Sequence, residues 1–248
     1  MVETIFIAMV YETIVVIFVS ILLALILLKY LEKKHKLTLY LFFIFVNFTL
    51  AILFSWISKV LVIFSDIEYI KDINITMDPG TLESWFVLRI VDFRFSFLFT
   101  TIAIYLSYIL KVKAFEKEYN PIYRVIVIIF GIYTGFHSIF IYQAGSVLSM
   151  LLAFLFPFIY MSMIYFPFMF RSIQSYKAIK DPIFKRGFLS LAIMSLSFTL
   201  VFFFFVIDRL LILLGNPRFT IFYFLAWASV VVGILGAYLG YIRPRSKD

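Results

Sequence analysis

The sequence predicts an all-α integral membrane protein: a bundle of seven transmembrane helices with its N-terminus outside the cell and its C-terminus in the cytoplasm. Three observations predict this fold, namely an apolar composition, seven separate apolar stretches and a one-sided distribution of basic residues. The 248-residue chain is 64% hydrophobic and 21% aromatic, only 15% of it is charged, and its mean hydropathy is +1.07. Soluble domains of this length carry a larger charged share, so the composition indicates a membrane protein.

Seven stretches are long enough to form membrane-spanning helices. Such a helix needs about 20 mostly apolar residues to cross the hydrocarbon core. We expect helices at about residues 4–29, 38–65, 84–110, 122–142, 147–170, 187–214 and 219–242 within one domain. The first stretch is too long for the apolar core of a signal peptide, and Glu3 rather than a basic residue precedes it, so we expect no cleavage there.

Short connections divide the later spans. Residues 120–121, Asn-Pro, separate the third span from the fourth, because the residue before a proline disfavours the helical conformation. Residues 143–146 join the fourth span to the fifth and residues 215–217 join the sixth to the seventh, which makes the joined helices antiparallel neighbours. Within the fifth span, Pro157 and Pro167 predict kinks or local loosening, since proline removes a helical hydrogen bond.

Basic residues gather on one side of this arrangement. Most of the 22 Lys and Arg residues lie in the segments 29–36, 111–124, 171–186 and 243–247. The opposite connections contain Lys71 and Arg218 together with the acidic residues Asp66, Glu68, Asp72, Asp78 and Glu83. Cytoplasmic loops carry an excess of Lys and Arg, which predicts the stated orientation in the cell membrane. The net charge of +8 is therefore a topology signal, and we expect no nucleic-acid partner.

The long external connection, residues 66–84, contains a possible modification site. Asn74-Ile75-Thr76 matches the N-glycosylation acceptor pattern on the side where modification could occur.

The third predicted span carries three charged residues, Arg89, Asp92 and Arg94. Charges inside hydrocarbon are costly, so they usually face the bundle interior and a partner. Arg89 and Asp92 are three residues apart, a spacing that places both on one face of a continuous helix. We therefore expect this helix to provide the polar centre of the bundle.

Further polar and tryptophan residues lie at similar depth in the outer half of other spans. The candidate ligand-binding residues are Glu12, Trp56, Lys59, Arg89, Asp92, Arg94, Asp208, Arg209 and Trp227. We expect an outward-facing polar pocket between the first, second, third, sixth and seventh spans. Its four cations exceed its three carboxylates, which favours a small anionic ligand such as a carboxylate or phosphate. The alternative is that these residues pair with one another and fix the register of the helices.

Several kinds of chemical site are not expected. The chain has no cysteine, which excludes disulfides and thiolate sites, and it lacks both the H-E-x-x-H and the P-loop motif. His35 and His137 belong to opposite sides of the bundle. An acid–base pair would need Asp92 and Asp208 to lie side by side. We therefore predict no catalytic residue, no metal site and no cofactor, and expect that the protein is not an enzyme.

Seven helices with an external N-terminus and a polar outer pocket resemble the heptahelical membrane sensors of prokaryotes and archaea. Arg89-Ile90-Val91-Asp92, with Thr100-Thr101 further along, is similar to the counterion region on the third helix of microbial rhodopsins. Those pigments attach retinal to a lysine on the seventh helix, whereas residues 219–242 contain none. The resemblance therefore implies the fold and a sensor role without a retinal cofactor. Heavy use of Ile, Phe and Lys is typical of an AT-rich prokaryotic or archaeal genome.

Three functions agree with these features. The first is a receptor or sensor whose basic inner segments, residues 111–124 and 171–186, contact a separate cytoplasmic partner. Only six residues follow the last span, so we expect no attached output domain. The second is a small-molecule transporter or channel, although transporters usually place polar residues near the midplane. The third is a structural subunit of a larger membrane complex.

Overall fold

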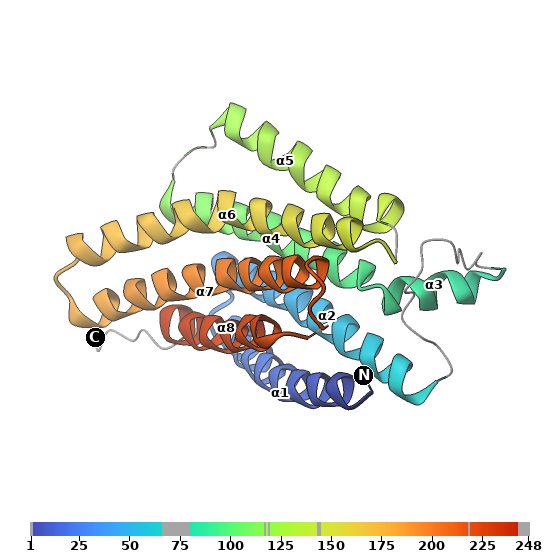
Figure 1. The fold of residues 1–248 in the computed structure, drawn as a ribbon. Coiled ribbons are helices and arrows are strands. Elements are labelled where there is room, and N and C mark those ends of the chain that lie inside the picture. Colours follow the sequence, from blue (N-terminus) through green and yellow to red (C-terminus); the bar gives the residue numbers. More distant parts are fainter. Residues whose placement is uncertain are drawn as a thin grey trace.

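The computed structural model describes residues 2–65, 80–116, 118, 120–142, 145–217 and 219–242, and within these ranges the chain is helical with no strand. The elements are α1 (Val2–Lys33), α2 (Lys36–Phe64), α3 (Leu82–Val91), α4 (Arg94–Phe115), α5 (Pro121–Phe136), the π-helix η1 (His137–Ile141), α6 (Val147–Ala178), α7 (Pro182–Leu213), α8 (Ile221–Ala237) and the π-helix η2 (Tyr238–Ile242). Figure 1 shows the long helices running roughly side by side.

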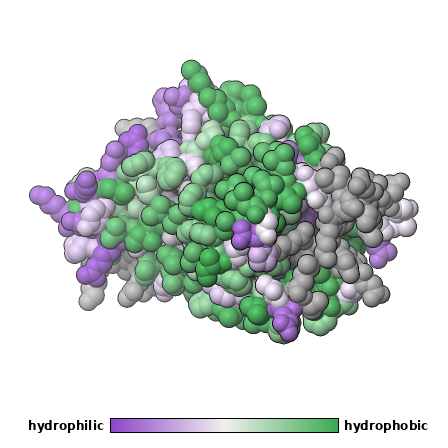
Figure 2. Space-filling view, viewed as in Figure 1, coloured by the Kyte–Doolittle hydropathy of each residue, from purple (hydrophilic) through white to green (hydrophobic). Residues whose placement is uncertain are grey.

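Seven of the described helices are long and apolar enough to cross a membrane, as predicted. Large apolar side chains such as Leu28, Ile122 and Phe140 are more than half exposed on the outside of the bundle. Figure 2 shows an apolar surface over the middle of the molecule and hydrophilic residues towards one end. Helices long enough to cross a membrane, with an apolar outer surface, are what a bilayer core requires, because lipid rather than water surrounds the protein there. The structure therefore indicates a membrane-embedded protein.

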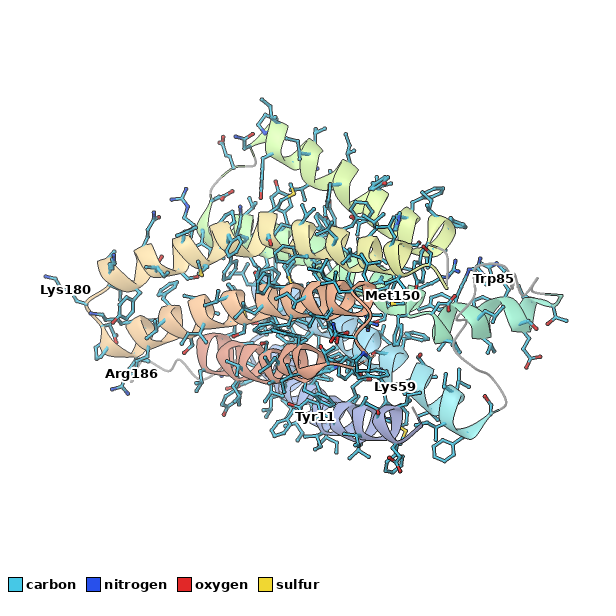
Figure 3. All side chains as sticks on the ribbon, in the orientation of Figure 1. Tyr11, Lys59, Trp85, Met150, Lys180 and Arg186 are labelled. Carbon is cyan, nitrogen blue, oxygen red and sulfur yellow. The ribbon has the colours of Figure 1, made fainter. Side chains whose placement is uncertain are left out.

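The two ends of the bundle are distinct. Figure 1 places the start of α1 and all of α3 at one end, called here the N-terminal side, and the junction of α6 and α7 at the other, called here the C-terminal side. Lys180 and Arg186 lie on the C-terminal side in Figure 3. The predicted external loop with Asn74, the residue Arg218 and the basic segment 243–247 lie outside the described residues.

Local sequence explains where several helices begin. Asn120 caps α5, because its side-chain oxygen accepts a hydrogen bond from the Tyr123 amide at 3.1 Å. Asp181 caps α7 in the same way, with 2.7 Å to the Ile183 amide. In both helices proline occupies the first turn, where its fixed φ angle suits a helix and its missing N–H costs nothing. The boundary predicted at residues 120–121 is confirmed.

The third predicted span is the one that the structure corrects. Instead of one helix over 84–110, α3 ends at Val91 and α4 begins at Arg94, and Phe93 between them has a left-handed φ of 63°. This conformation is unfavourable for a residue with a Cβ. Ser58 of α2 compensates, since its hydroxyl donates to the Val91 carbonyl at 2.8 Å and satisfies an acceptor at the broken end. The break depends on a contact from another helix, which the hydropathy of this stretch does not reveal.

The helices on the C-terminal side are longer than predicted. The helix α6 continues through Pro157 and Pro167 to Ala178, and α7 begins at Pro182 rather than near residue 187. The predicted antiparallel neighbours α7 and α8 pack closely: a Cβ on Gly236 of α8 would lie 2.9 Å from the Ser190 carbonyl of α7. By contrast, Figure 1 shows α5 tilting away from α6.

Candidate functional site

A buried ion pair joins α1 and α2 on the N-terminal side. Glu12 and Lys59 are both fully buried, and the Lys59 Nζ lies 2.7 Å from Glu12 Oε1. The Ser55 hydroxyl lies 3.3 Å from each carboxylate oxygen, and the Tyr223 hydroxyl of α8 donates to the same carboxylate. Lys59 also donates to the Ser55 carbonyl at 3.1 Å. Residues of α2 and α8 thus hydrogen-bond the carboxylate, and Ser55 of α2 also accepts from the ammonium, so both charges have further partners, which is the condition for a stable buried pair.

A second pair lies at the junction of α7 and α8. Asp208 is fully buried and accepts hydrogen bonds from the Thr220 amide at 2.8 Å and the Thr220 hydroxyl at 2.6 Å. Its other carboxylate oxygen is 3.6 Å from Arg209 Nε, and that nitrogen has no hydrogen-bond partner. Arg209 instead places its Nη1 3.2 Å from the Met150 sulfur and its guanidinium 4.8 Å from the Phe154 ring centre. Arg209 is therefore held by weaker acceptors than Lys59, whose carboxylate partner lies at 2.7 Å.

A third pair brackets the break between α3 and α4. Arg94 lies 3.2 Å from Asp92 Oδ2 and donates to the Ile139 carbonyl at 3.1 Å. Ile139 belongs to η1, where the wider π-helical turn changes the usual hydrogen-bond pattern of the backbone. Arg94 thereby links the broken helix to the end of α5, and the pair does not open into the centre of the bundle.

Arg89 stands apart from the other charged residues. Its guanidinium stacks on Trp85 of the same short helix, 3.5 Å from the ring centre, and donates to the Trp85 carbonyl at 3.2 Å. Within the described part of the chain it has no carboxylate partner, and its Nε is buried without an acceptor. The Asp92 carboxylate, which the spacing places on the same helical face as Arg89, pairs with Arg94 instead, at 3.2 Å. The excess cation identified in the sequence is Arg89.

The two remaining candidates have different positions. Trp56 donates its indole N–H to the Thr13 hydroxyl at 2.9 Å and so joins α2 to α1. Trp227 of α8 is buried, lines a cavity in the centre of the bundle, and has an indole N–H without a hydrogen-bond partner among the described residues.

The central cavity lies between α1, α2, α4, α6, α7 and α8 and has a volume of about 80 Å³. A water molecule needs about 10–15 Å³ on the same measure, so the cavity could hold several waters or a slender ligand. Lys59 and Arg209 line it, whereas their carboxylate partners Glu12 and Asp208 do not. Figure 3 shows Lys59 and Met150, the contact of Arg209, towards the N-terminal side of the bundle. The wall thus presents the positive member of each pair.

The rest of the wall is mainly apolar and aromatic. It includes Phe45, Phe97, Phe198, Phe205 and Trp227, with Ser55, Ser96 and Thr100 as the small polar residues. On α7, lining residues run from Arg209 to Phe198, eleven residues or about 16 Å along the helix. The cavity is therefore elongated, with cationic groups at one end and an aromatic body. Such a site can hold a molecule with a hydrogen-bond acceptor at one end and an apolar remainder.

The expected polar pocket is thus brought together only in part. Lys59, Arg209 and Trp227 line one cavity, and Glu12 and Asp208 stand behind the two cations. The remaining candidates Arg89, Asp92, Arg94 and Trp56 do not line it. Nothing in the sequence singles out Tyr223, one of 16 tyrosines, or Phe93, which has a left-handed backbone and also lines the cavity.

No group of three or more His, Asp or Glu residues that could hold a metal ion occurs among the residues that the structure describes. His137 packs its ring against Phe156, with the ring centres 4.8 Å apart. Comparisons with protein-family models, curated proteins and solved structures find no match to this chain. Function is therefore inferred from the geometry of the site.

Proposed function

We propose that the protein is a seven-helix membrane receptor or sensor whose ligand occupies the central cavity. The observation that supports this is the uneven wall: two buried cations, Lys59 and Arg209, line one end, and aromatic residues line the rest. A cavity that served only packing would gain nothing from charged lining, because buried charge is costly.

The wall chemistry favours a small amphipathic ligand with a carboxylate or similar anionic group. Arg209 is the better anchor, since its present contacts are a sulfur, a ring face and a carboxylate at 3.6 Å. A ligand carboxylate would provide the charge-assisted, paired hydrogen bonds that an arginine prefers. The apolar body of the ligand would then lie along Phe198 and Phe205 of α7.

In this proposal the N-terminal side faces outward, in agreement with the distribution of basic residues. The cavity wall includes Phe93 at the strained junction of α3 and α4, so a ligand that displaces this ring would alter the position of α4. The basic segments 111–124 and 171–186 on the opposite side would transmit the change to a separate cytoplasmic partner.

The test is a thermal-unfolding screen of the protein in nanodiscs of zwitterionic lipid. Straight-chain carboxylates of increasing length are compared with the corresponding alcohols. A ligand at a hundred times its Kd stabilises the folded state by about 2.7 kcal/mol. We expect stabilisation to peak at one chain length, to be weaker for the alcohol, and to be lost in Arg209→Gln.

Arg186→Gln, at an exposed position on the C-terminal side, is the matched control and should respond as the wild type does. Trp227→Phe, which keeps an aromatic ring but removes the indole N–H, provides a second variant if Arg209→Gln does not fold. The absence of any stabilisation across the series, or an unchanged response in both variants, would refute the ligand proposal.

A second candidate, a structural subunit of a membrane complex, is favoured by the pairing itself. Glu12, Asp92 and Asp208 each have a cation within 3.6 Å, so the pairs could act only to fix helix register. For a structural subunit, charge-removing substitutions would reduce stability without changing any ligand response, and the purified protein would associate with a second membrane component.

A further inference from the structure

A large apolar groove lies apart from the central cavity, between α3, α4 and α5. It has a volume of about 760 Å³ and is lined by residues such as Trp85, Phe95, Ile102, Ile132 and Phe140. Its walls come mainly from α3, α4, α5 and η1, and Figure 1 shows α5 on the outside of the bundle. The lining residue Thr101 already donates its hydroxyl to the Phe97 carbonyl at 2.8 Å. The groove therefore suits an apolar occupant.

The groove covers about half the thickness of a membrane. Its lining on α4 runs from Phe95 to Tyr105, ten residues or about 15 Å, and a hydrocarbon core is about 30 Å thick. Just beyond Tyr105, at the end of the groove towards the C-terminal side, the ring centres of Tyr108 and Tyr123 are 5.7 Å apart. The Tyr123 hydroxyl also donates to the Met163 carbonyl of α6. These contacts join α5 to its neighbours. A transmembrane helix from a partner would have to continue past this point, whereas a lipid chain ends near the midplane.

Beside Trp85, at the α3 end of the groove, lies a cation suited to bind a phosphate group. Trp85 lines the groove, and Arg89 stacks directly on it at 3.5 Å. Lys59, Arg94 and Arg209 each have a carboxylate partner, while among the described residues Arg89 has none and keeps one buried N–H without an acceptor. The guanidinium binds phosphate through parallel hydrogen bonds, and tryptophan favours the depth of lipid headgroups.

We propose that this groove binds one anionic phospholipid from the leaflet on the N-terminal side. The lipid phosphate contacts Arg89 beside Trp85, and one acyl chain lies between α4 and α5 over Ile132. This site is separate from the central cavity and does not depend on the ligand proposed there.

The test uses Trp85 as a local reporter of lipid contact. The chain has three tryptophans, so Trp56→Phe and Trp227→Phe together leave Trp85 as the single fluorophore. The protein is placed in nanodiscs containing phosphatidylglycerol or phosphatidylcholine brominated near the carboxyl end of the chain, and quenching is measured against the unbrominated lipid. We expect half-maximal quenching to require about one fifth as much brominated phosphatidylglycerol as brominated phosphatidylcholine. This fivefold ratio is equivalent to about 1 kcal/mol, the contribution of one arginine near the membrane surface.

Two substitutions in this double-phenylalanine background distinguish recognition of the lipid headgroup from binding of the acyl chain. Arg89→Gln should remove the preference for phosphatidylglycerol, whereas Arg186→Gln at the opposite end should keep it. Ile132→Phe should reduce quenching by both lipids because it narrows the groove. Ile129→Phe is its matched control, since Ile129 is 63% exposed on the same helix but does not line the groove.

Three results would overturn the proposal. They are an unchanged lipid preference in Arg89→Gln, equal effects of the two isoleucine substitutions, and protection of Trp85 from both brominated lipids. The last result would mean that a protein helix or a second copy of the chain covers the groove, and native mass spectrometry would then detect the complex.

Discussion

Removing one partner of the Glu12–Lys59 pair should destabilise the protein more than any exposed charge substitution. Both residues are fully buried, and their charged atoms are 2.7 Å apart. Lys59→Met keeps the length and apolar volume of the side chain but removes its charge. Glu12 would then retain only hydroxyl partners, those of Ser55 and Tyr223, for a full negative charge away from solvent.

The expected cost follows from this geometry. Breaking a buried ion pair by removing one partner costs about 3–5 kcal/mol, while replacing the whole pair by neutral groups is often nearly neutral. We therefore expect Lys59→Met to lower the free energy of unfolding by about 3–5 kcal/mol. The double variant with Glu12→Gln should regain most of that loss, because the amide oxygen still accepts from Tyr223 and no charge remains.

The assay is reversible unfolding of the reconstituted protein, measured for both single variants and the double variant as a mutant cycle. The control is Lys29→Met, because Lys29 pairs with Glu32 at 3.4 Å with the carboxylate 55% exposed, and such pairs contribute about 0–1 kcal/mol. Single effects that add to within about 0.5 kcal/mol in the double variant would show that the two residues do not interact. A loss for Lys59→Met no larger than for Lys29→Met would equally refute the reasoning.

Two further substitutions test the packing and the helix break. Gly236→Ala should destabilise the protein by about 1–3 kcal/mol, because its new methyl group would meet the backbone of α7 at 2.9 Å. Gly80→Ala, where nothing lies within 4 Å, should change the free energy of unfolding little, and equal losses in the two variants would contradict the α7–α8 contact. Arg94→Ala should destabilise the protein by about 3–5 kcal/mol, since it leaves the buried Asp92 carboxylate uncompensated. It should also increase hydrogen exchange in η1, where the Ile139 carbonyl loses its donor, and unchanged exchange there would disprove the link.

The sequence predicted the helical segments well where local signals determine them. Six of the seven predicted spans appear as continuous elements, with η1 and η2 continuing α5 and α8, because the length of an apolar run and its capping residues are properties of neighbouring residues. Asn120-Pro121 is an example, since both the cap and the proline act within one turn. The apolar run predicts that α6 ends near residue 170 and that α7 begins near residue 187, whereas α6 continues to Ala178 and α7 begins at Pro182. The difference arises because polar residues of these helices extend beyond the apolar run.

The site was predictable only at the level of residue type. Depth within apolar spans indicates that four residues are interior charges, since charge in such a span requires a partner. They are Glu12, Lys59, Asp208 and Arg209. Their partners could not be assigned, because each pairing depends on helix rotation. The i, i+3 spacing places Arg89 and Asp92 on one helical face, yet Asp92 pairs with Arg94 at the start of α4.

By itself, therefore, the sequence determined an all-helical chain with seven membrane-length apolar segments, and it predicted an orientation from the placement of basic residues. These properties follow from local composition, and the bilayer requires them of any chain that crosses it. Only the tertiary structure decided the break at Phe93, the partner of each charge, the cationic end of the central cavity and the groove beside α5. Each of these depends on groups distant in sequence, such as Ser58 on the Val91 carbonyl and Tyr223 on Glu12, which meet only when the helices pack.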